Sequence, residues 1–393
     1  MKYIDIDSMK QSATQDGCEI IYSIKIDHTP YDLTYKITGD IFSVPERCDA
    51  VVASLLLHAM RNRMNIRSAL PISKKLFYNF VTHIIPNIHF CNPDKTHKTI
   101  LEMPVTEEAY NSTWNGTGIS LGVDSLCTIH EYTDDCLFDD LKLTHLVHLK
   151  VGAHHANKGY FCKNTEDSLF AEENASVKNY CEKYNYNLVT IESNLFEICN
   201  KEFGFFFGIT HTLLNLGTML LVQHKFNKYY YASAYNLDKF SIDVNADMAY
   251  YEKWLIPYLE SENIKFFSAN KALQRFDKTE YLTQFPDTYD FLHVCVKSEK
   301  NCGTCIKCLR TIVALDLLGA LPKYKNVFDL EAYYAKRKKY IRQVIAFRKK
   351  DPFYQEIYTY MKKNGIKTPG FFPCVWARII FYGSIIRKKL LAR

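Results

Sequence analysis

Strand-like and helix-like segments alternate between residues 109 and 322, and this alternation limits the folds open to the chain more than any other feature. Consecutive parallel strands need a crossover connection, usually a helix, so regular alternation predicts an α/β fold with a doubly wound parallel sheet. Ligands bind such sheets at the carboxyl ends of the strands. The expected strands are 113–119, 143–151, 187–191 and 228–234, and the expected helices follow residue 125 and cover 171–183 and 209–225.

The region before residue 109 has a different pattern. Residues 1–108 contain two strand patterns joined by an Asp-His-Thr-Pro turn, then two helix patterns, and no catalytic constellation. We therefore expect an α+β accessory domain that offers a surface to a protein partner. Its expected strands are 18–26 and 31–37, and its expected helices are 49–62 and 71–84.

The last region, residues 323–393, is predicted to be a helical tail, and its charge sets it apart. The whole chain has a net charge of +6, but residues 324–393 hold 17 Lys and Arg against 4 Asp and Glu, which gives +13 and leaves −7 for the remainder. A basic tail on an acidic body favours an anionic partner, either RNA or a membrane surface. Residues 371–393 combine aromatic and aliphatic residues with basic ones, as interfacial helices do.

Cysteine use and the first residues bear on the cellular compartment. The chain has 13 cysteines, and its start, MKYIDIDSMKQ, lacks the basic-then-apolar pattern of a signal segment. Disulfides are rare where thiols are kept reduced, so we expect free thiols and a cytoplasmic location. No apolar run approaches the roughly 18 residues that a bilayer span requires, so no span is expected.

The segment from Gly116 to Ser125 reads Gly-Thr-Gly-Ile-Ser-Leu-Gly-Val-Asp-Ser and lies between a strand and a helix. Small residues let backbone N–H groups approach an anion, and the helix directs its positive end toward it. The segment is neither a Walker loop nor a dinucleotide fingerprint, because it lacks Gly-Lys-Ser and reads G-x-G-x-x-x-G. Asp124 would repel a lone phosphate, so its presence suggests magnesium between carboxylate and pyrophosphate.

At these residues the chain resembles the PP-loop ATP pyrophosphatase superfamily, whose HUP-like fold carries the signature Ser-Gly-Gly-x-Asp-Ser. Leu121 stands where the family has its first glycine, and a side chain there either obstructs the phosphates or requires a strained backbone. The resemblance implies ATP with magnesium as the cofactor. The expected ATP and pyrophosphate ligands are Ser120, Leu121, Gly122, Val123, Asp124, Ser125 and Lys150.

Four cysteines lie within fourteen residues, as Cys295-x6-Cys302-x2-Cys305-x2-Cys308. Three cysteines at steps of three on a Gly-containing turn can face one centre, and Cys295 can close a tetrahedral site from the preceding strand. Four thiolates without an open position are typical of structural zinc. An iron–sulfur cluster is the competing interpretation, and chance clustering in a Cys-rich chain is the third.

The phosphate loop and the cysteine motif, followed by Arg310, together resemble 7-cyano-7-deazaguanine synthase over about residues 110–322. That family adenylates a deazaguanine carboxylate and brings in ammonia in ATP-dependent steps. The resemblance implies a carbon–nitrogen ligase domain at 109–322 with a structural zinc knot. The regions before and after it have no counterpart in the compact enzyme. They suggest a specialised relative, of the kind found in surface-polysaccharide, natural-product and anti-phage (antiviral) defence pathways.

The implied chemistry assigns roles to further residues. Magnesium and the loop would hold the phosphates while a small carboxylate substrate, or a protein acceptor, attacks the α-phosphorus and pyrophosphate leaves. Asp124 and Ser125 are the expected catalytic residues. The candidates for contacts with substrate or phosphate are His211, Thr212, Arg275 and Lys278, with His154 and His155 as weaker ones.

Two other functional classes remain open at this stage. One is a PP-loop tRNA-modifying enzyme that uses the basic tail to hold RNA, and its sulfur-transfer form would need a reactive, exposed cysteine. The other is a catalytically inactive nucleotide-binding subunit, which Leu121 makes conceivable.

Overall fold

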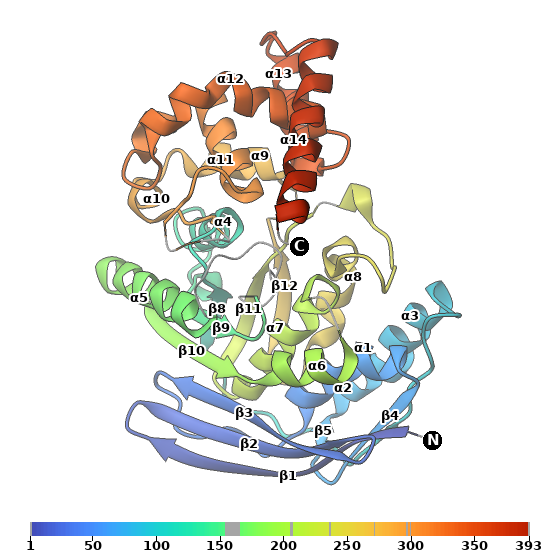
Figure 1. The fold of residues 1–393 in the computed structure, drawn as a ribbon. Helices are drawn as coiled ribbons and strands as arrows, with labels where there is room; N and C mark the ends of the chain where they lie inside the picture. The colour runs from blue at the N-terminus through green and yellow to red at the C-terminus, as the bar shows by residue number, and fades with distance from the viewer. Residues whose placement is uncertain are drawn as a thin grey trace. The chain divides into compact units, whose positions relative to one another are not determined.

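The computed structural model of the chain describes residues 2–153, 166–204, 207–235, 237–270, 272–295, 298 and 300–391. It is an α/β structure around a ten-stranded, mostly parallel sheet, as the alternation of strands and helices predicts (Figure 1). The chain divides into two compact units. The first consists of Met1–Ser120, Thr128–Gly159 and Asn164–Lys271, and the second of Leu121–Cys127, Tyr160–Lys163 and Ala272–Arg393.

Five parallel strands form one half of the sheet, in the order β12-β11-β8-β9-β10. Consecutive strands run from β8 to β10 on one side and from β11 to β12 on the other, so the order reverses beside β8. In such sheets the carboxyl ends of the strands at the reversal are the usual ligand site. The strands are β8 (Trp114–Gly118), β9 (His145–Lys150), β10 (Asn187–Ser193), β11 (Phe226–Ala232) and β12 (Lys265–Ala269).

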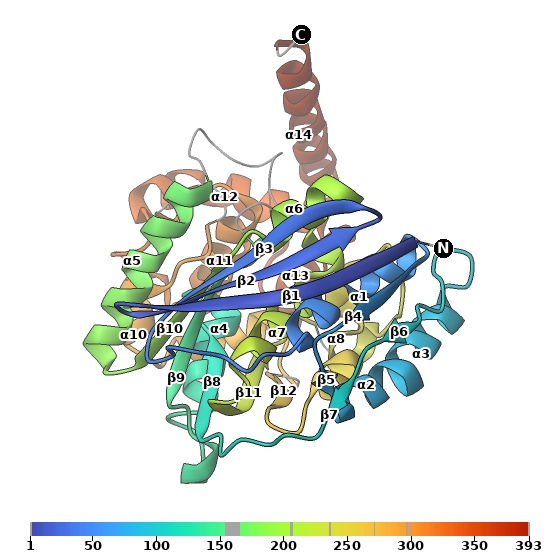
Figure 2. The ribbon, with the colours of Figure 1, turned by 90° about the horizontal axis from the view of Figure 1, so that it is seen from below.

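The N-terminal residues extend this same sheet (Figure 2). Strands β1 (Lys2–Thr14), β2 (Gly17–Ile26) and β3 (Thr29–Thr38) form an antiparallel meander, and β3 pairs antiparallel with β10. Strands β4 (Met64–Ser68) and β6 (Leu101–Glu102) follow in parallel beyond β1. The compact units therefore do not coincide with the regions 1–108, 109–322 and 323–393, because strand pairing unites the first region with the parallel strands.

Local residue choices explain the meander. Asp27 and His28 both have left-handed backbones, with φ of 46° and 79°, and such a two-residue turn matches the twist of a hairpin. Along β3, Leu33, Tyr35 and Ile37 are fully buried while the residues between them are not, which is the alternation of a strand with one covered face. Strand β1 lies where no strand was expected, since much of it is exposed and polar.

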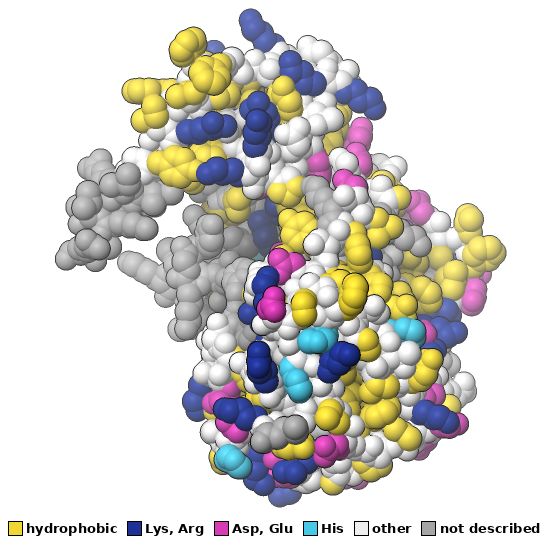
Figure 3. Space-filling model, turned by 90° about the vertical axis from the view of Figure 1, so that its right-hand side faces the viewer, with side chains coloured by type: hydrophobic (Ala, Val, Ile, Leu, Met, Phe, Trp, Pro, Cys, Tyr) yellow, Lys and Arg dark blue, Asp and Glu magenta, His cyan; other side chains and the backbone are white. Residues whose placement is uncertain are grey.

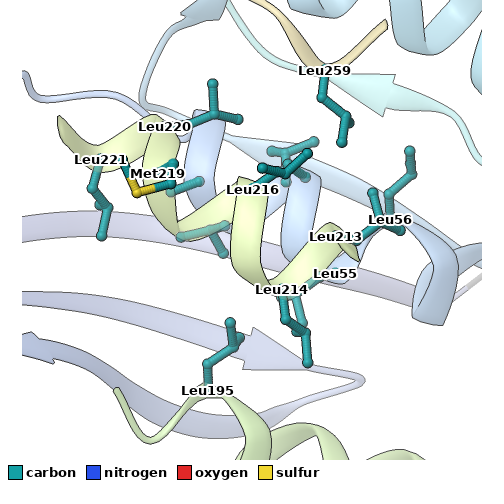
Figure 4. Close-up of a cluster of buried hydrophobic side chains, with 14 of the residues drawn as sticks. Leu55, Leu56, Leu195, Leu213, Leu214, Leu216, Met219, Leu220, Leu221 and Leu259 are labelled. Atoms are coloured by element: carbon teal, nitrogen blue, oxygen red, sulfur yellow. The ribbon is translucent and has the colours of Figure 1, made fainter. Parts of the chain in front are cut away.

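The core of the first unit lies around helices α1 (Asp49–Arg61) and α7 (His211–Met219), which pack against each other. Gly217 allows a close approach, because a Cβ atom there would lie 2.3 Å from Oγ of Ser54. Figure 4 shows leucines of both helices meeting Leu195 and Leu259. Helix α1 is buried over nearly its whole length, so it is apolar all round rather than on one face.

The predicted helix 71–84 is wrong in its bounds and its regularity. Ser73 accepts a hydrogen bond from the Leu76 amide at 3.2 Å, so this capping side chain starts the helix late. The chain then passes through a π-helical turn, and the last helix continues to Cys91. The segments are α2 (Lys74–Asn79), the π-helix Phe80–Ile84 and α3 (Ile85–Cys91), preceded by β5 (Ile72–Ser73), which pairs with β7 (Val105–Thr106).

Four more helices lie wholly or partly in the first unit. They are α4 (Val123–Glu131), α5 (Glu166–Tyr184), α6 (Leu195–Phe203) and α8 (Glu252–Leu255). The first turn of α4 belongs to the second unit and its remainder to the first.

Helices make up most of the second unit, and the basic tail is helical as predicted. Asp329 and Asp351 cap α12 and α13, where their side chains accept from backbone amides at 3.0 and 2.8 Å. Among residues 2–391, leaving out the undescribed gaps, no helix has the length and apolarity needed to cross a membrane. The helices are α9 (Arg275–Leu282), α10 (Asp287–Phe291), α11 (Ile306–Leu317), α12 (Leu330–Phe347), α13 (Pro352–Lys363) and α14 (Phe371–Leu391).

Candidate active site and metal centre

The phosphate-loop segment enters the second unit at Leu121, whose backbone is left-handed with φ of 54°. Its side chain is 1% exposed, and its carbonyl accepts a hydrogen bond from the His293 amide at 2.9 Å. A left-handed conformation costs a side-chain-bearing residue about 1–2 kcal/mol and costs glycine nothing comparable. The backbone at this position is thus one that glycine would adopt freely, and the leucine side chain is buried.

Helix α4 begins directly after this residue. The Leu126 amide donates to the Gly122 carbonyl at 3.0 Å, and Ser125 Oγ donates to the same carbonyl at 3.2 Å. Backbone N–H groups in the first turn of a helix point out of its end and favour a negative charge there. Asp124 and Ser125 therefore lie at the electropositive end of α4.

Asp124 is held between two cations from α9. Arg275 pairs with one carboxylate oxygen, and Lys278 Nζ lies 2.9 Å from the other. The Lys278 side chain is 1% exposed, so its charge is placed where water cannot solvate it. Burial alone would raise the pKa of Asp124, but the charges of Arg275 and Lys278 outweigh burial and hold that pKa well below its usual range.

Two further cations come from the start of α11. Although Lys307 is exposed over part of its side chain, desolvation and the charges of Arg310 and Arg275 lower its pKa to about 8. Only Asp124 and Cys305 oppose this shift. The first turn of α4 thus faces more positive than negative charge within the second unit, which is the electrostatic setting of an anion site.

The tail helix α13 supports this cationic cluster. The Arg310 guanidinium lies 4.0 Å from the ring centre of Phe353, and that of Arg275 lies 5.8 Å from it. Nearby, the rings of Phe276 and Tyr360 stack at 4.2 Å, and the Phe276 amide donates to Glu356 at 2.9 Å. Cation–π contacts hold guanidinium groups in place without neutralising them, so the tail helps to position these cations.

The four predicted metal ligands come together. The Sγ atoms of Cys295, Cys302, Cys305 and Cys308 all lie within 4.8 Å of one another. Zinc–sulfur bonds of about 2.3 Å in a tetrahedron bring sulfur atoms to this kind of separation. The spacing of Cys302 and Cys308, 4.0 Å, is typical of that geometry. A cluster of iron and sulfide would hold the thiolates farther apart, so the arrangement favours a single metal ion.

Local structure pre-forms the metal site. The Cys305 amide points at the Cys302 sulfur at 3.3 Å and the Cys308 amide at the Cys305 sulfur at 3.4 Å, the pattern of a Cys-x2-Cys turn around a metal. Gly303 supplies a left-handed residue with φ of 65°. Hydrogen bonds from the Cys305 and Cys308 thiols lower the pKa of Cys295, while the same contacts raise that of Cys308. Without a cation the thiols share protons, and a metal would convert them all to thiolates.

The other predicted site residues belong to the first unit and have partners there. Lys150 Nζ lies 3.6 Å from a Glu192 oxygen. His211 contacts the Tyr231 hydroxyl at 3.0 Å and Asp247 at 3.1 Å, and Thr212 donates to Glu252 at 3.3 Å. Ser120 is the last residue of its segment of the first unit. His154 and His155 lie outside the described residues.

His211 is the best-connected of these residues. Its burial lowers the pKa, but the hydrogen bond to Asp247 and the charge of Glu252 outweigh burial, so the net pKa is raised. Burial also raises the pKa of Tyr231, which therefore stays protonated. His211, Tyr231 and Asp247 thus form a hydrogen-bonded chain within the first unit.

Sequence reasoning named Arg275 and Lys278 as candidates for phosphate or substrate contact, not as partners of Asp124. It missed Lys307, Phe353 and the partners of His211. Lys307 lies inside the cysteine motif, directly before Cys308, and its position there could have indicated a cation close to the site. Phe353 lies in the tail and carries no local mark of its role. Comparisons of the chain with protein-family models, with curated proteins and with solved structures gave no match.

Proposed function

We propose that the second unit binds the phosphates of ATP, and that the protein uses ATP to activate a carboxylate as an acyl-adenylate for attack by a nitrogen nucleophile. The resemblance to 7-cyano-7-deazaguanine synthase makes a deazaguanine-like acid the first substrate class to test. The four-cysteine site would hold a structural zinc ion in this unit. Reduced thiolates at that site suit a cytoplasmic enzyme.

One observation carries the proposal, which is Asp124 in the first turn of α4 between Arg275 and Lys278. Two buried or nearly buried cations on one carboxylate concentrate positive charge at the start of α4. Lys307 also interacts electrostatically with Asp124, and Arg310 with Lys307, so the net charge around Asp124 is positive. A polyphosphate matches this excess, and helix ends that bind phosphates have the same combination of amides and cations.

The donor set fits magnesium delivered with ATP. Magnesium in nucleotide sites takes one or two carboxylates and completes its shell with phosphates and water, and Asp124 is the carboxylate that would hold it. When bound, the ion would neutralise charge on the departing pyrophosphate. Both oxygens of Asp124 are paired with cations, so metal binding requires Arg275 or Lys278 to pass from the carboxylate to a phosphate oxygen.

The residues of this unit have clear parts in such a reaction. Arg275 and Lys278 would bind the β- and γ-phosphates and stabilise the charge that develops as the bond to the α-phosphorus breaks. Ser125 adds a hydroxyl donor at the helix end. Phe353 would keep the guanidinium of Arg310 oriented through the contact with its ring.

The decisive experiment supplies ATP labelled at the α-phosphate, candidate acids, and hydroxylamine as a nitrogen trap. We expect AMP and pyrophosphate in equal amounts, with hydroxamate formed only when an accepted acid is present. ADP and phosphate as the products would contradict adenylation.

Variants locate the activity. Asp124→Ala and Lys278→Ala should each slow AMP formation by about a hundredfold or more, since a lost phosphate or metal contact costs several kcal/mol of transition-state stabilisation. Arg337→Ala is the matched control, because Arg337 also pairs with an aspartate, Asp316 at 2.7 Å in the same unit, but takes no part in the site. Its rate should equal that of the unsubstituted protein.

A nucleotide-binding subunit without catalysis is the second candidate, and two observations favour it. Leu121 stands at the loop position where glycine is expected, and Asp124 already has both oxygens paired. In that case calorimetry would detect ATP binding that depends on Lys278, while no acid would yield AMP.

A further inference from the structure

Helix α14 has two different faces, and one of them packs inside the second unit. The rings of Phe381 and Phe347 of α12 lie 4.8 Å apart, and Arg378 donates to the Ala346 carbonyl at 2.6 and 2.8 Å. Cys374 is 9% exposed on the same side. These contacts define which side of the helix is turned toward α12.

The opposite face is apolar and open to solvent. Phe372, Trp376, Ile379 and Ile380 are 82%, 63%, 54% and 49% exposed. Their spacing of four, three and one residues places them on one stripe of a helix, and Phe371 adjoins it with 76% exposure. Figure 3 shows hydrophobic side chains beside Lys and Arg over the upper part of that view, where α12, α13 and α14 lie.

Charge identifies the partner of this stripe. Residues 371–393 contain five basic residues and no acidic one. Helix α12 adds the run Lys336-Arg-Lys-Lys339 to the same unit. All charged residues of the segment 371–393 are therefore basic. An apolar stripe with Trp and Phe in a segment of such composition is typical of helices that lie in the headgroup region of anionic bilayers.

RNA suits the stripe less well than lipid. RNA would pair with the basic residues and stack on aromatic rings, but it would leave Ile379 and Ile380 exposed to water. In a bilayer the aliphatic and aromatic members enter the acyl boundary together. The helix does not meet the requirements for spanning, so it would lie along the surface.

We propose that α14 docks the protein on an anionic membrane surface, with the stripe Phe372, Trp376, Ile379 and Ile380 inserted between headgroups. This proposal is independent of the nucleotide chemistry proposed for the same unit. The partner is the lipid surface itself, recognised by its negative charge and its apolar interior.

The test is flotation of the full chain with vesicles. Vesicles of phosphatidylcholine and phosphatidylglycerol at a ratio of 7:3 should carry the protein at 0.1 M salt. Binding should weaken about tenfold or more at 0.5 M salt and on pure phosphatidylcholine, because screening and loss of anionic lipid remove the electrostatic attraction. Equal binding to both vesicle types, or none to either, overturns the proposal.

A pair of matched variants tests the stripe. Phe372→Glu should abolish flotation, whereas Phe90→Glu should not change it, since Phe90 on α3 is 83% exposed and Phe372 82%. Equal effects of the two substitutions contradict a specific stripe. Unchanged circular dichroism and zinc content exclude misfolding as the cause. Retained flotation of Phe372→Glu, or salt-sensitive RNA binding without vesicle binding, also overturns it.

Trp376 reports insertion directly. The chain has three tryptophans, so the spectrum of a Trp376→Phe variant is subtracted from that of the unsubstituted protein. The difference emission should shift to shorter wavelength when anionic vesicles are added. An unshifted difference spectrum, measured while the protein is bound, means that another surface makes the contact.

Discussion

The two units treat their charged groups in opposite ways. In the first, His211 lies between Tyr231 and Asp247, and the hydrogen-bonded chain is complete without any added group. In the second, Asp124 meets Arg275 and Lys278, with further positive charge beside them and four clustered thiols elsewhere in the same unit. His211 in the first unit thus has its partners within that unit, whereas the second unit contains a net positive site and a thiol site that external ligands would complete.

The two units also differ in what contributes to their stability. A large apolar cluster, including Leu55, Leu213 and Leu216, lies within the first unit. In the second unit, a metal ion at the cysteine site would join Cys295 to the segment that carries Cys302, Cys305 and Cys308. The second unit also buries apolar side chains, among them Leu309, Val313 and Val344. A bound metal ion would add to that burial, and the following experiments measure how much each unit depends on bound groups.

The largest effect should follow removal of the metal. We expect purified protein to hold about one zinc ion per chain, and Cys305→Ser to lose it together with several kcal/mol of stability, because zinc binding to four thiolates is coupled to folding. Hydrogen exchange should rise over residues 272–363 while the strands of the first unit stay protected. Zinc analysis and exchange mass spectrometry measure the two effects.

Cys91→Ser serves as the control for this experiment, since Cys91 is exposed and outside the cluster. It should retain both metal and protection. An iron–sulfur absorption band, a protein without metal, or equal loss of protection in both units would refute the contrast.

The second effect concerns the carboxylate between two cations. Asp124→Asn leaves Arg275 and Lys278 facing each other without a counter-charge, and breaking such a partly buried pair should cost about 1–3 kcal/mol. Added phosphate should restore more stability to the variant than it adds to the unsubstituted protein, because it replaces the missing negative charge. Thermal unfolding with and without phosphate measures this.

Asp139→Asn is the control, because Asp139 pairs with Lys142 at 2.7 Å but its side chain is 94% exposed. We expect no measurable change in its unfolding temperature. A phosphate effect of the same size in both variants would mean that the cations of α9 form no anion site.

The third effect is a pH dependence of opposite sign in the two units. The pKa of Asp124 is lowered, so its ion pairs contribute fully above about pH 4 and are lost as the pH falls below that value. The pKa of His211 is raised, so its contribution is complete below about pH 6.5 and is lost as the pH rises through its higher folded value.

Urea unfolding followed separately in the two units, between pH 3 and pH 9, tests the signs. Asp247→Asn should remove the alkaline loss in the first unit, since the hydrogen bond that His211 donates to Asp247 is the main cause that raises the pKa of His211. An imidazole that titrates at or below pH 6.5 in NMR spectra would reverse the expectation.

The smallest effect concerns a single backbone angle. The Leu121→Gly variant should have a free energy of unfolding equal to or higher than that of Leu121→Ala. The reason is that a φ of 54° penalises any side chain by about 1 kcal/mol. Leu126 is buried inside α4, and Leu126→Gly should have a free energy of unfolding about 1 kcal/mol lower than that of Leu126→Ala. Chemical denaturation of the four variants gives the two differences, and equal signs would show that Leu121 is not strained.

The sequence predicted the parts of the fold that depend on local pattern. The apolar runs of β9 and β10 and the amphipathic segment of α5 are visible in the residues themselves. The pairing of β3 with β10 cannot be seen in the residues, because either strand could pair with the edge strand of another sheet. The π-helical turn at Phe80–Ile84 follows no simple period and was missed. Strand β1 was also missed, although the buried Ile4 and Ile6 alternate with polar residues at its start.

The candidate site also has parts that local sequence predicts and parts that it does not. Cysteine spacing alone predicts the thiol cluster, because its ligands lie within fourteen residues and a turn brings them together. Asp124 and its partners are about 150 residues apart in sequence, and Arg275 and Lys278 were two among several candidates. The contact of Phe353 with Arg310 depends on how α13 packs, which local sequence does not encode.

The seam between β3 and β10 has a consequence for how the chain is made. Thr38 pairs with Thr190, so the meander emerges from the ribosome about 150 residues before the strand that covers its edge. At synthesis rates of about 5–20 residues per second, β3 stays unpaired for roughly 8–30 s. An open edge with one apolar face is a template for pairing between chains. Nascent chains of this protein should therefore need protection by a chaperone during that interval, and slowed translation between residues 38 and 190 should increase aggregation.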